Sequence, residues 1–332
     1  MIVVYITILI ILLLALAKHK VEFPYGFSQQ RSLRLKGILS VLIVLTHCSS
    51  RMPITQPWGA IVVGIFMFMT GYGLYASYEK KGSSYLDNFF KKKFIKLLPP
   101  LVIATCVYSI YRIASGKATA LSLLQGFAEG NVPIGATWYV YAIIYFYCLF
   151  FVSLKFGRSK FWLEMSLMTT GLLSYCFIIY KLGWGAWWWM SSPAVLVGMI
   201  YQRFENAILT IYTKQQNALL AGALIICATW FAYLVLTDGL TYVHIRKLLP
   251  IYWFITIPII FVIYRTGIFE NRLLDFLGLL SYDIYIVHDM FVCSMIGIKG
   301  FNTIEIITII FVLTFAMAYA LNKFCYKVTS RI

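Results

Sequence analysis

Hydrophobic residues along this 332-residue chain are grouped into long runs that short polar segments separate. Each run approaches the length of about 20 residues that an α-helix needs to span the hydrocarbon layer of a bilayer. Such runs lie near residues 1–17, 35–50, 59–77, 97–114, 136–154, 161–180, 186–202, 217–236, 248–264, 273–295 and 303–321. The pattern therefore predicts an all-α fold: a polytopic transmembrane helical bundle of about 10–11 helices without a soluble domain.

Composition strengthens this prediction. Hydrophobic residues make up 61% of the chain and charged residues only 12%, whereas a soluble globular domain carries about 25% charged residues. The lipid bilayer is therefore an expected partner. The net charge of +16 could also indicate nucleic-acid binding, but basic residues collect in the cytoplasmic loops of membrane proteins. We expect no nucleic-acid partner, because no soluble domain is long enough to bind one.

The distribution of Lys and Arg predicts the orientation of the helices. Residues 15–17 resemble a signal-peptide cleavage site. However, Lys18 and Lys20 follow the first apolar run and no basic residue precedes it, which favours a retained anchor at 1–17 with its N-terminus outside. From that start, 21 of the 28 basic residues fall in predicted cytoplasmic segments and 7 outside. Residues 323–332 then form a short basic cytoplasmic tail.

Residues with reactive side chains are rare within the apolar runs. The seven cysteines form no CxxC pair, so neither a disulfide framework nor a metal site is predicted. Ionisable residues at membrane depth are costly and by default are functional candidates. The deepest are His47, Asp283, His288 and Asp289, while Glu164, Asp275 and Glu305 lie less deep.

Lys36 and His47 share one predicted helix. Eleven residues at 100° each bring their side chains to within about 20° of one direction, about 16 Å apart along the axis. Lys36, at the cytoplasmic end, is either a phosphate-binding residue or a positive-inside anchor. His47, further in, is either a general base, since imidazole exchanges protons near neutral pH, or a hydrogen-bonding partner of another helix.

The segment 277–289 holds the other deep ionisable residues. Asp283 is five residues from His288, and Asp289 is its neighbour. A carboxylate could orient the imidazole across the bundle. The three residues therefore form either an accessory site or a structural polar cluster.

Three further segments leave alternatives open. In residues 70–73, TGYG, the glycines permit either close helix packing or the close approach of a ligand to the backbone. The stretch 85–100 interleaves aromatic residues, leucines and lysines, which is typical of an interfacial amphipathic helix, with Pro99 and Pro100 marking a break before the next span. The tryptophans at 184–189 indicate either an aromatic belt or a sugar-stacking surface.

Five segments in order form a recognisable pattern. Ten residues separate Lys36 from His47, residues 65–74 read IFMFMTGYGL, 92–99 read KKFIKLLP, 138–140 read WYV and 277–288 read LGLLSYDIYIVH. Together they resemble the motifs of the acyltransferase 3 family of integral-membrane acyltransferases. Their order and spacing fit from residue 30 to residue 320.

This resemblance implies a membrane domain over 30–322, with 1–17 as an added anchor. It also implies transfer of an acyl group, usually acetyl, from cytosolic acyl-CoA (acetyl-CoA) to a hydroxyl of an envelope glycan or lipid-linked glycan at a bacterial-type plasma membrane. The catalytic histidine proposed for the family carries over to His47, and Trp138 and Tyr139 fall on the acceptor side. The implied acyl-donor site comprises Lys36, Thr70, Gly71, Tyr72, Lys92, Lys93 and Lys96.

The sequence departs from the family pattern where lysine replaces arginine. Lys36 stands in place of the family arginine, and the basic segment 92–99 also has lysines. Lysine attracts phosphate as a point charge but lacks the bidentate fork of a guanidinium. Charge-based binding of the donor is therefore expected to survive the change. Thr70 replaces a serine and keeps the hydroxyl group.

A transporter or flippase for a glycan or lipid-linked precursor is the alternative function. Such proteins often contain repeated halves with interrupted helices, and this sequence has no internal repeat. A membrane scaffold would leave the costly His47 without a purpose. For the enzyme, two mechanisms stay open: His47 deprotonates the acceptor hydroxyl for direct attack on the thioester, or His47 itself is acylated.

Overall fold

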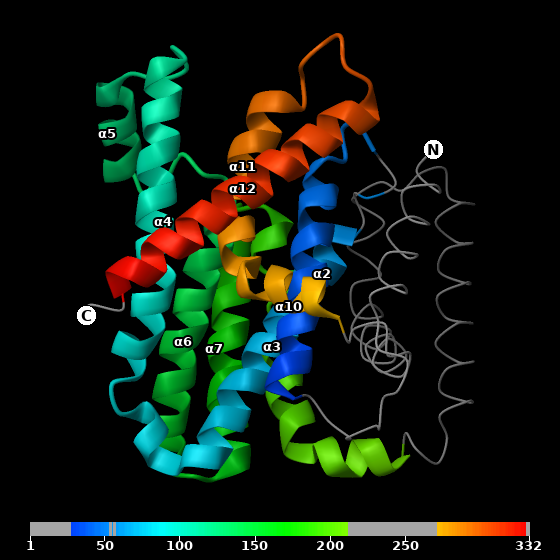
Figure 1. The fold of residues 1–332 in the computed structure, drawn as a ribbon. Coiled ribbons are helices and arrows are strands. Elements are labelled where there is room, and N and C mark those ends of the chain that lie inside the picture. Colours follow the sequence, from blue (N-terminus) through cyan, green and yellow to red (C-terminus); the bar gives the residue numbers. More distant parts are fainter. Residues whose placement is uncertain (1–27, 53–54, 56–57, 212–270, 330–332) are drawn as a thin grey trace, which may run out of the picture. The chain divides into compact units, whose positions relative to one another are not determined.

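The computed structural model describes residues 28–52, 55, 58–211 and 271–329 (Figure 1). Every regular element within these residues is a helix, so the predicted all-α class is confirmed. The predicted spans at 1–17, 217–236 and 248–264 lie outside the described residues. The α-helices are α2 (Gln29–His47), α3 (Trp58–Lys81), α4 (Phe89–Ala114), α5 (Ala120–Ala128), α6 (Thr137–Gly157), α7 (Phe161–Lys181), an unlabelled helix at 193–211, α10 (Arg272–Leu279), α11 (Ser281–Met295) and α12 (Thr303–Thr329).

Five of the described helices are long and apolar enough to cross a membrane, namely α3, α4, α6, α7 and α12. A sixth candidate consists of α10 and α11, which pass the same test together but meet at an angle of 70°. The predicted continuous span at 273–295 is therefore broken at Leu280. Helix α12 continues to Thr329 and includes most of the predicted tail 323–332.

The prediction for residues 85–100 was wrong in its boundaries. A 3₁₀-helix, η2 (Gly82–Leu86), precedes α4, which begins at Phe89 and includes the lysine-rich stretch as its first turns. Pro99 and Pro100 lie inside α4 rather than at a break. Membrane helices tolerate internal proline where neighbouring groups bind the exposed backbone. Beside the two prolines, the carbonyl of Leu97 accepts a hydrogen bond from the Tyr282 hydroxyl (2.7 Å).

The chain forms two compact units. Unit 1 contains residues 1–42, 57–76 and 190–279, and unit 2 contains residues 43–56, 77–189 and 280–332. Helix α2 is continuous from Gln29 to His47, so its sequence contributes to both.

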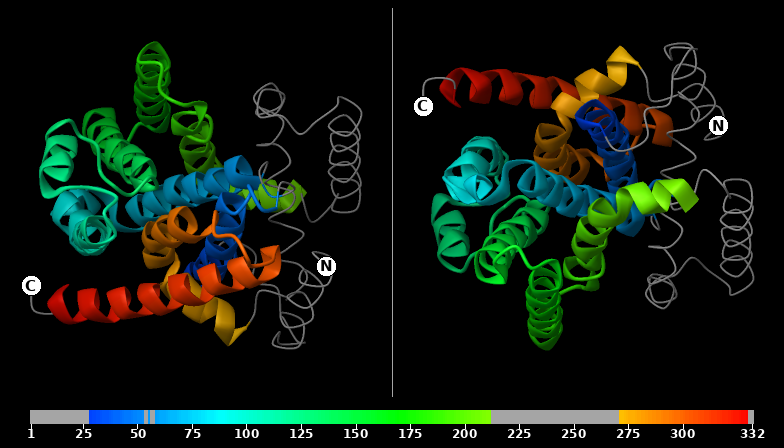
Figure 2. Two further views of the ribbon diagram at one scale, coloured as in Figure 1. Left: turned by 90° about the horizontal axis from the view of Figure 1, so that it is seen from above. Right: turned by 90° about the horizontal axis from the view of Figure 1, so that it is seen from below.

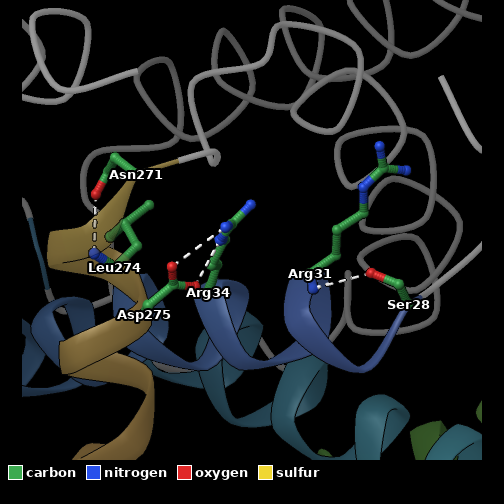
Figure 3. A network of polar contacts seen from close by, with 6 residues as sticks. All are labelled: Ser28, Arg31, Arg34, Asn271, Leu274 and Asp275. Carbon is green, nitrogen blue, oxygen red and sulfur yellow. Dashed lines mark hydrogen bonds and ion pairs between the residues drawn. The ribbon is translucent and has the colours of Figure 1, made fainter. Parts of the chain in front are cut away.

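Polar side chains fix the helix starts in unit 1. The Ser28 hydroxyl accepts a hydrogen bond from the backbone N–H of Arg31 (3.2 Å), which caps α2 and explains why it starts before residue 35. Asn271 caps α10 in the same way, through the N–H of Leu274 (2.8 Å). Figure 3 shows the ion pair that joins these two helices, from Arg34 Nε to an oxygen of Asp275 (2.6 Å).

Glycines set the helix crossings in unit 1. A Cβ atom at Gly71 would overlap the carbonyl group of Val195, and one at Gly198 would overlap the carbonyl of Phe68. Helix α3 and the helix at 193–211 therefore approach to backbone contact. Of the two roles that the sequence left open for Gly71, close packing is the one its contacts show.

Unit 2 packs α4, α6, α7, α11 and α12 around aromatic side chains. Both views in Figure 2 show α12 alongside α11, and Asn322 Nδ2 of α12 donates a hydrogen bond to Asp283 Oδ2 of α11 (2.7 Å). The start of α4 packs on the end of α6, with the rings of Phe89 and Phe150 stacked at 5.9 Å between centroids. Because Tyr282 lies at Leu97 and the later residue Asp289 lies near Tyr108, α11 and α4 run in the same direction.

Gly71 and Gly73 provide a matched test of the helix crossing in unit 1. Gly71→Ala should lower the free energy of unfolding by about 1–3 kcal/mol, because the new methyl group meets backbone that cannot move aside. Nothing lies within 4 Å of a Cβ at Gly73, so Gly73→Ala should cost nothing and can gain helix propensity. Thermal unfolding in detergent measures both. Equal stability of the two variants would contradict the close approach.

Candidate functional site

His47 is the last residue of α2 and is exposed on the protein surface. Its Nδ1 lies 2.9 Å from the carbonyl oxygen of Ile43, one turn earlier in the same helix. A carbonyl oxygen can only accept, so Nδ1 carries the hydrogen and Nε2 carries the lone pair in the neutral ring. The local fold thereby presents His47 Nε2 as the basic nitrogen.

The segment that follows His47 is bound to the end of α11. Arg51 Nε donates a hydrogen bond to the carbonyl of Ile296 (2.8 Å), and its Nη2 donates to that of Ile298 (2.6 Å). The Thr55 hydroxyl donates to the carbonyl of Leu45 (2.9 Å). The two Arg51 bonds hold the segment after α2 against the end of α11, and the Thr55 bond ties that segment back to α2; all five residues belong to unit 2.

His288 of α11 lies next to His47. The two ring centroids are 4.6 Å apart, and the ring planes meet at 68°, an edge-to-face arrangement. The His288 side chain is fully buried, with 0% exposure, and its Nδ1 lies 2.6 Å from the carbonyl oxygen of Tyr285. By the same reasoning Nδ1 is the donor. Nε2 has no hydrogen-bond partner among the described residues.

The acidic residues of α11 do not orient His288, contrary to one reading of the sequence. Asp289 Oδ2 accepts a hydrogen bond from the backbone N–H of Gly135 (2.7 Å), and its Oδ1 accepts a longer one from the Cys293 thiol (3.5 Å). Asp283 instead binds α12, as described above. Backbone carbonyl groups, not carboxylates, orient both imidazoles.

Asp289 and Tyr285 together hold the turn that precedes α6. Beside the Asp289–Gly135 bond, the Tyr285 hydroxyl donates to the carbonyl of Ala136 (2.9 Å). Gly135 has little space, since a Cβ there would lie 3.1 Å from Asp289 Oδ2. Tyr285, His288 and Asp289 are three and four residues apart and share one face of α11. The turn before α6 and the His47 ring therefore contact the same face of this helix.

Aromatic rings connect the histidines to the surface. Tyr139 lies 5.0 Å from the ring of Tyr285, which in turn lies 5.6 Å from His288. The ring of Trp138 lies 5.9 Å from that of Trp188, which follows α7 in the 3₁₀-helix η3 (Ala186–Trp188) and contacts the exposed Trp184 at 4.5 Å. The predicted acceptor-side residues Trp138 and Tyr139 thus belong to an aromatic cluster that extends from the histidine pair to exposed tryptophan.

The predicted donor lysines of unit 2 lie at the opposite end of α6. There, the Tyr78 hydroxyl lies 3.3 Å from the Ser159 hydroxyl, which brings the lysine-rich stretches 80–96 and 155–160 to the same end. Lys92 and Lys96 are exposed. Lys93 differs, because its ammonium nitrogen lies 5.3–5.6 Å from the centroids of three rings, those of Tyr85, Phe89 and Tyr147.

The distance between these two ends of the site follows from the helices. Lys93 is four residues before Leu97 on α4, and His288 is six residues beyond Tyr282 on α11, while Leu97 and Tyr282 are in contact. At 1.5 Å per residue, the histidine pair lies about 15 Å from Lys93 along the helix axes.

The remaining predicted donor residues belong to unit 1. Lys36 lies on α2 eleven residues before His47, and the helix between them is unbroken, as predicted. The Thr70 hydroxyl donates to the carbonyl of Phe66 (2.9 Å), and the Tyr72 hydroxyl donates to Glu205 Oε2 (2.8 Å). Nothing in the sequence pattern indicated the Glu205 contact. The donor-binding role of these residues stays a prediction.

Residues 34–323 match a family model described as an acyltransferase domain. The chain belongs to the acyltransferase 3 family. This assignment and the apolar helices make the protein a multi-pass membrane acyltransferase. The matched range includes both histidines and the lysines of α4, whereas the predicted anchor 1–17 precedes it. No curated protein sequence and no solved structure matches the chain significantly.

Asp289 allows a direct test of the turn before α6 in this acyltransferase. Asp289→Ala should speed amide hydrogen exchange at Gly135 about tenfold or more, because a hydrogen bond to a charged acceptor is lost. Asp289→Asn keeps an acceptor oxygen and should retain most of the protection. Cys293→Ala is the control, since it removes only the longer contact to Asp289. Unchanged exchange in Asp289→Ala would contradict the bond.

Proposed function

We propose that this family member transfers an acyl group, most simply acetyl, from cytosolic acetyl-CoA to a hydroxyl of an envelope glycan or lipid-linked glycan. The reaction takes place at a bacterial-type plasma membrane, with His47 as the general base. One observation supports the role of His47 above all: its Nδ1 is bound to the Ile43 carbonyl, so its exposed ring offers a lone pair at Nε2.

In the proposed reaction His47 Nε2 removes the proton of the acceptor hydroxyl. The oxygen attacks the thioester carbonyl carbon, a C–O bond forms and the C–S bond breaks. The proton on His47 passes to the leaving thiolate, which departs as the free thiol of CoA. Direct transfer needs only one well-placed base, and the single exposed imidazole of unit 2 matches that requirement.

The donor approaches from the lysine-rich end of unit 2 in this proposal. Acyl-CoA carries several phosphate charges, and Lys92 and Lys96 expose two cations there. Lys93 faces three aromatic rings. Its charge therefore adds to the positive electrostatic potential at this end, and its ammonium group does not contact a phosphate directly. The positive-inside rule assigns this end to the cytoplasm, where acyl-CoA is made.

The acceptor approaches from the aromatic end. Trp184 is 46% exposed and contacts Trp188, which lies beside Trp138 at the start of α6. Aromatic faces pack against the apolar faces of sugar rings and supply large contact areas at low entropic cost. A glycan hydroxyl placed by this cluster would meet the thioester at the histidine pair.

Replacement of His47 tests the proposed function. His47→Ala should reduce acyl transfer by about 10²–10⁴-fold, the usual contribution of a general base. The measurement is the O-acyl content of envelope glycans, by mass spectrometry, in cells that lack the gene and carry either variant or wild type. Ser50→Ala, an exposed neighbour, is the control. Full O-acylation by a membrane-inserted His47→Ala protein would overturn the proposal, and arrested glycan export would favour a transporter.

The donor end has its own matched pair of variants. The double variant Lys92→Ala/Lys96→Ala should raise KM for acetyl-CoA about tenfold, equivalent to 1.4 kcal/mol, and leave kcat nearly unchanged. Lys117→Ala/Lys181→Ala removes the same charge from exposed lysines at the other end and should leave KM unchanged. Transfer of labelled acetyl groups in membrane vesicles, over a range of salt concentrations, measures both. Equal KM values for the two double variants would contradict the assignment of the donor end.

A further inference from the structure

The buried nitrogen of His288 is the unexplained feature of the site. His288 is fully buried, and its Nε2 has no hydrogen-bond partner among the described residues. A buried polar atom without a partner destabilises the fold, because it gives up its hydrogen bonds to water and gains none in return. An apolar residue at this position would avoid that cost, so the atom needs a partner in some state of the reaction.

The protonation state of His288 follows from its surroundings. Nδ1 faces the Tyr285 carbonyl at 2.6 Å and must donate, so Nε2 of the neutral ring is an acceptor that needs a donor. The ring is fully buried, and its Nε2 has no donor among the described residues.

Most groups around His288 are already engaged. On α11 the Tyr285 hydroxyl is donated to Ala136, and the Cys293 thiol is donated to Asp289. Asp289 itself accepts from Gly135 and has no proton to give in its charged form. Besides His47, the titratable groups among the described residues that interact with His288 are Tyr285 and Asp289. One contact further away, Tyr139 lies against Tyr285, Cys293 and Tyr108 lie near Asp289, and Arg51 binds the end of α11.

His47 is the group that can become a donor. Its ring lies nearer to His288 than any other ring described, at 4.6 Å against 5.6 Å for Tyr285. Neutral His47 has a lone pair on Nε2 and cannot satisfy His288. Protonated His47 has an N–H at that position. Protonation of His47 therefore adds a donor N–H to the ring that lies 4.6 Å from His288.

We infer that His288 is a positioning residue whose Nε2 accepts a hydrogen bond from the N–H of protonated His47. This inference rests on the proposed role of His47 as base. The acceptor hydroxyl gives its proton to His47 Nε2 as the C–O bond forms and the C–S bond breaks. The His47 N–H is then donated to His288 Nε2 until the CoA thiolate takes the proton, after which both rings are neutral. His288 thus strengthens the base without touching the substrate.

The test measures protonation of His47 without requiring turnover. Diethyl pyrocarbonate modifies neutral imidazole, and cleavage after Lys36 and Arg51 releases His47 in peptide 37–51 for mass spectrometry. The full chain in lipid nanodiscs is labelled over a pH series. In His288→Phe the midpoint of labelling at His47 should move about one unit to lower pH, since one unit is a tenfold change in proton affinity. His288→Gln keeps an acceptor oxygen and should restore at least half of the shift.

The outcomes separate this inference from the proposed function. Hydrogen exchange at Gly135 shows that α11 is intact in each variant, because its bond to Asp289 does not involve His288. An unchanged midpoint in an intact His288→Phe protein, or equal midpoints for Phe and Gln, would overturn the inference. Labelling needs no substrate, so this result stands whether or not His47→Ala abolishes acyl transfer. A shifted midpoint together with slower transfer and an unchanged KM for acetyl-CoA is the expected result.

Discussion

Hydrocarbon offers no hydrogen bonds, so each polar group at membrane depth must find a partner within the protein. The Nδ1 atoms of His47 and His288 meet this constraint in the same way, by donating a hydrogen to a carbonyl of their own helix. That choice of partner fixes the tautomer of each ring and leaves the lone pair on Nε2. Four other side chains of unit 2 fix the surroundings of these two nitrogens. Arg51 and Thr55 hold the end of α2, and Tyr285 and Asp289 hold the turn before α6.

Three carboxylates of the described helices α10 and α11 accept hydrogen bonds from groups other than the imidazoles. Asp275 pairs with Arg34, Asp283 binds Asn322 and Asp289 binds the Gly135 amide. Each is costly in an apolar environment, and each accepts a hydrogen bond from a donor on another segment. Among the described residues, therefore, the hydrogen bonds of both imidazoles go to backbone carbonyl groups and not to carboxylates.

Apolar runs predicted α3, α6, α7 and α12 well, because span length and hydrophobicity fix such helices in a bilayer. The length and hydrophobicity of the runs did not predict two features, the start of α4 and the bend between α10 and α11. The lysines before Leu97 were predicted as a separate interfacial segment, but Lys93 packs against aromatic rings and continues α4. The chain stays apolar through Leu280, so periodicity gave no sign of the 70° bend there. The pairing of His47 with His288 depends on helix packing between distant segments, which no local pattern encodes, although each histidine alone was recognisable as costly.

The two proposed substrates differ in where they can go, and under that proposal this difference decides what the site must provide. A CoA thioester is highly charged and stays in water, while a glycan hydroxyl on the far side cannot cross the lipid. A reaction between them needs a base at intermediate depth, about 15 Å from the lysines of α4 by helical rise. An anionic base at that depth would need a permanent counter-ion, and the counter-ion would lower its affinity for the proton. In the proposed mechanism two neutral imidazoles avoid that requirement, because the pair is cationic only while His47 holds the proton, and the inferred bond to His288 Nε2 forms during that interval.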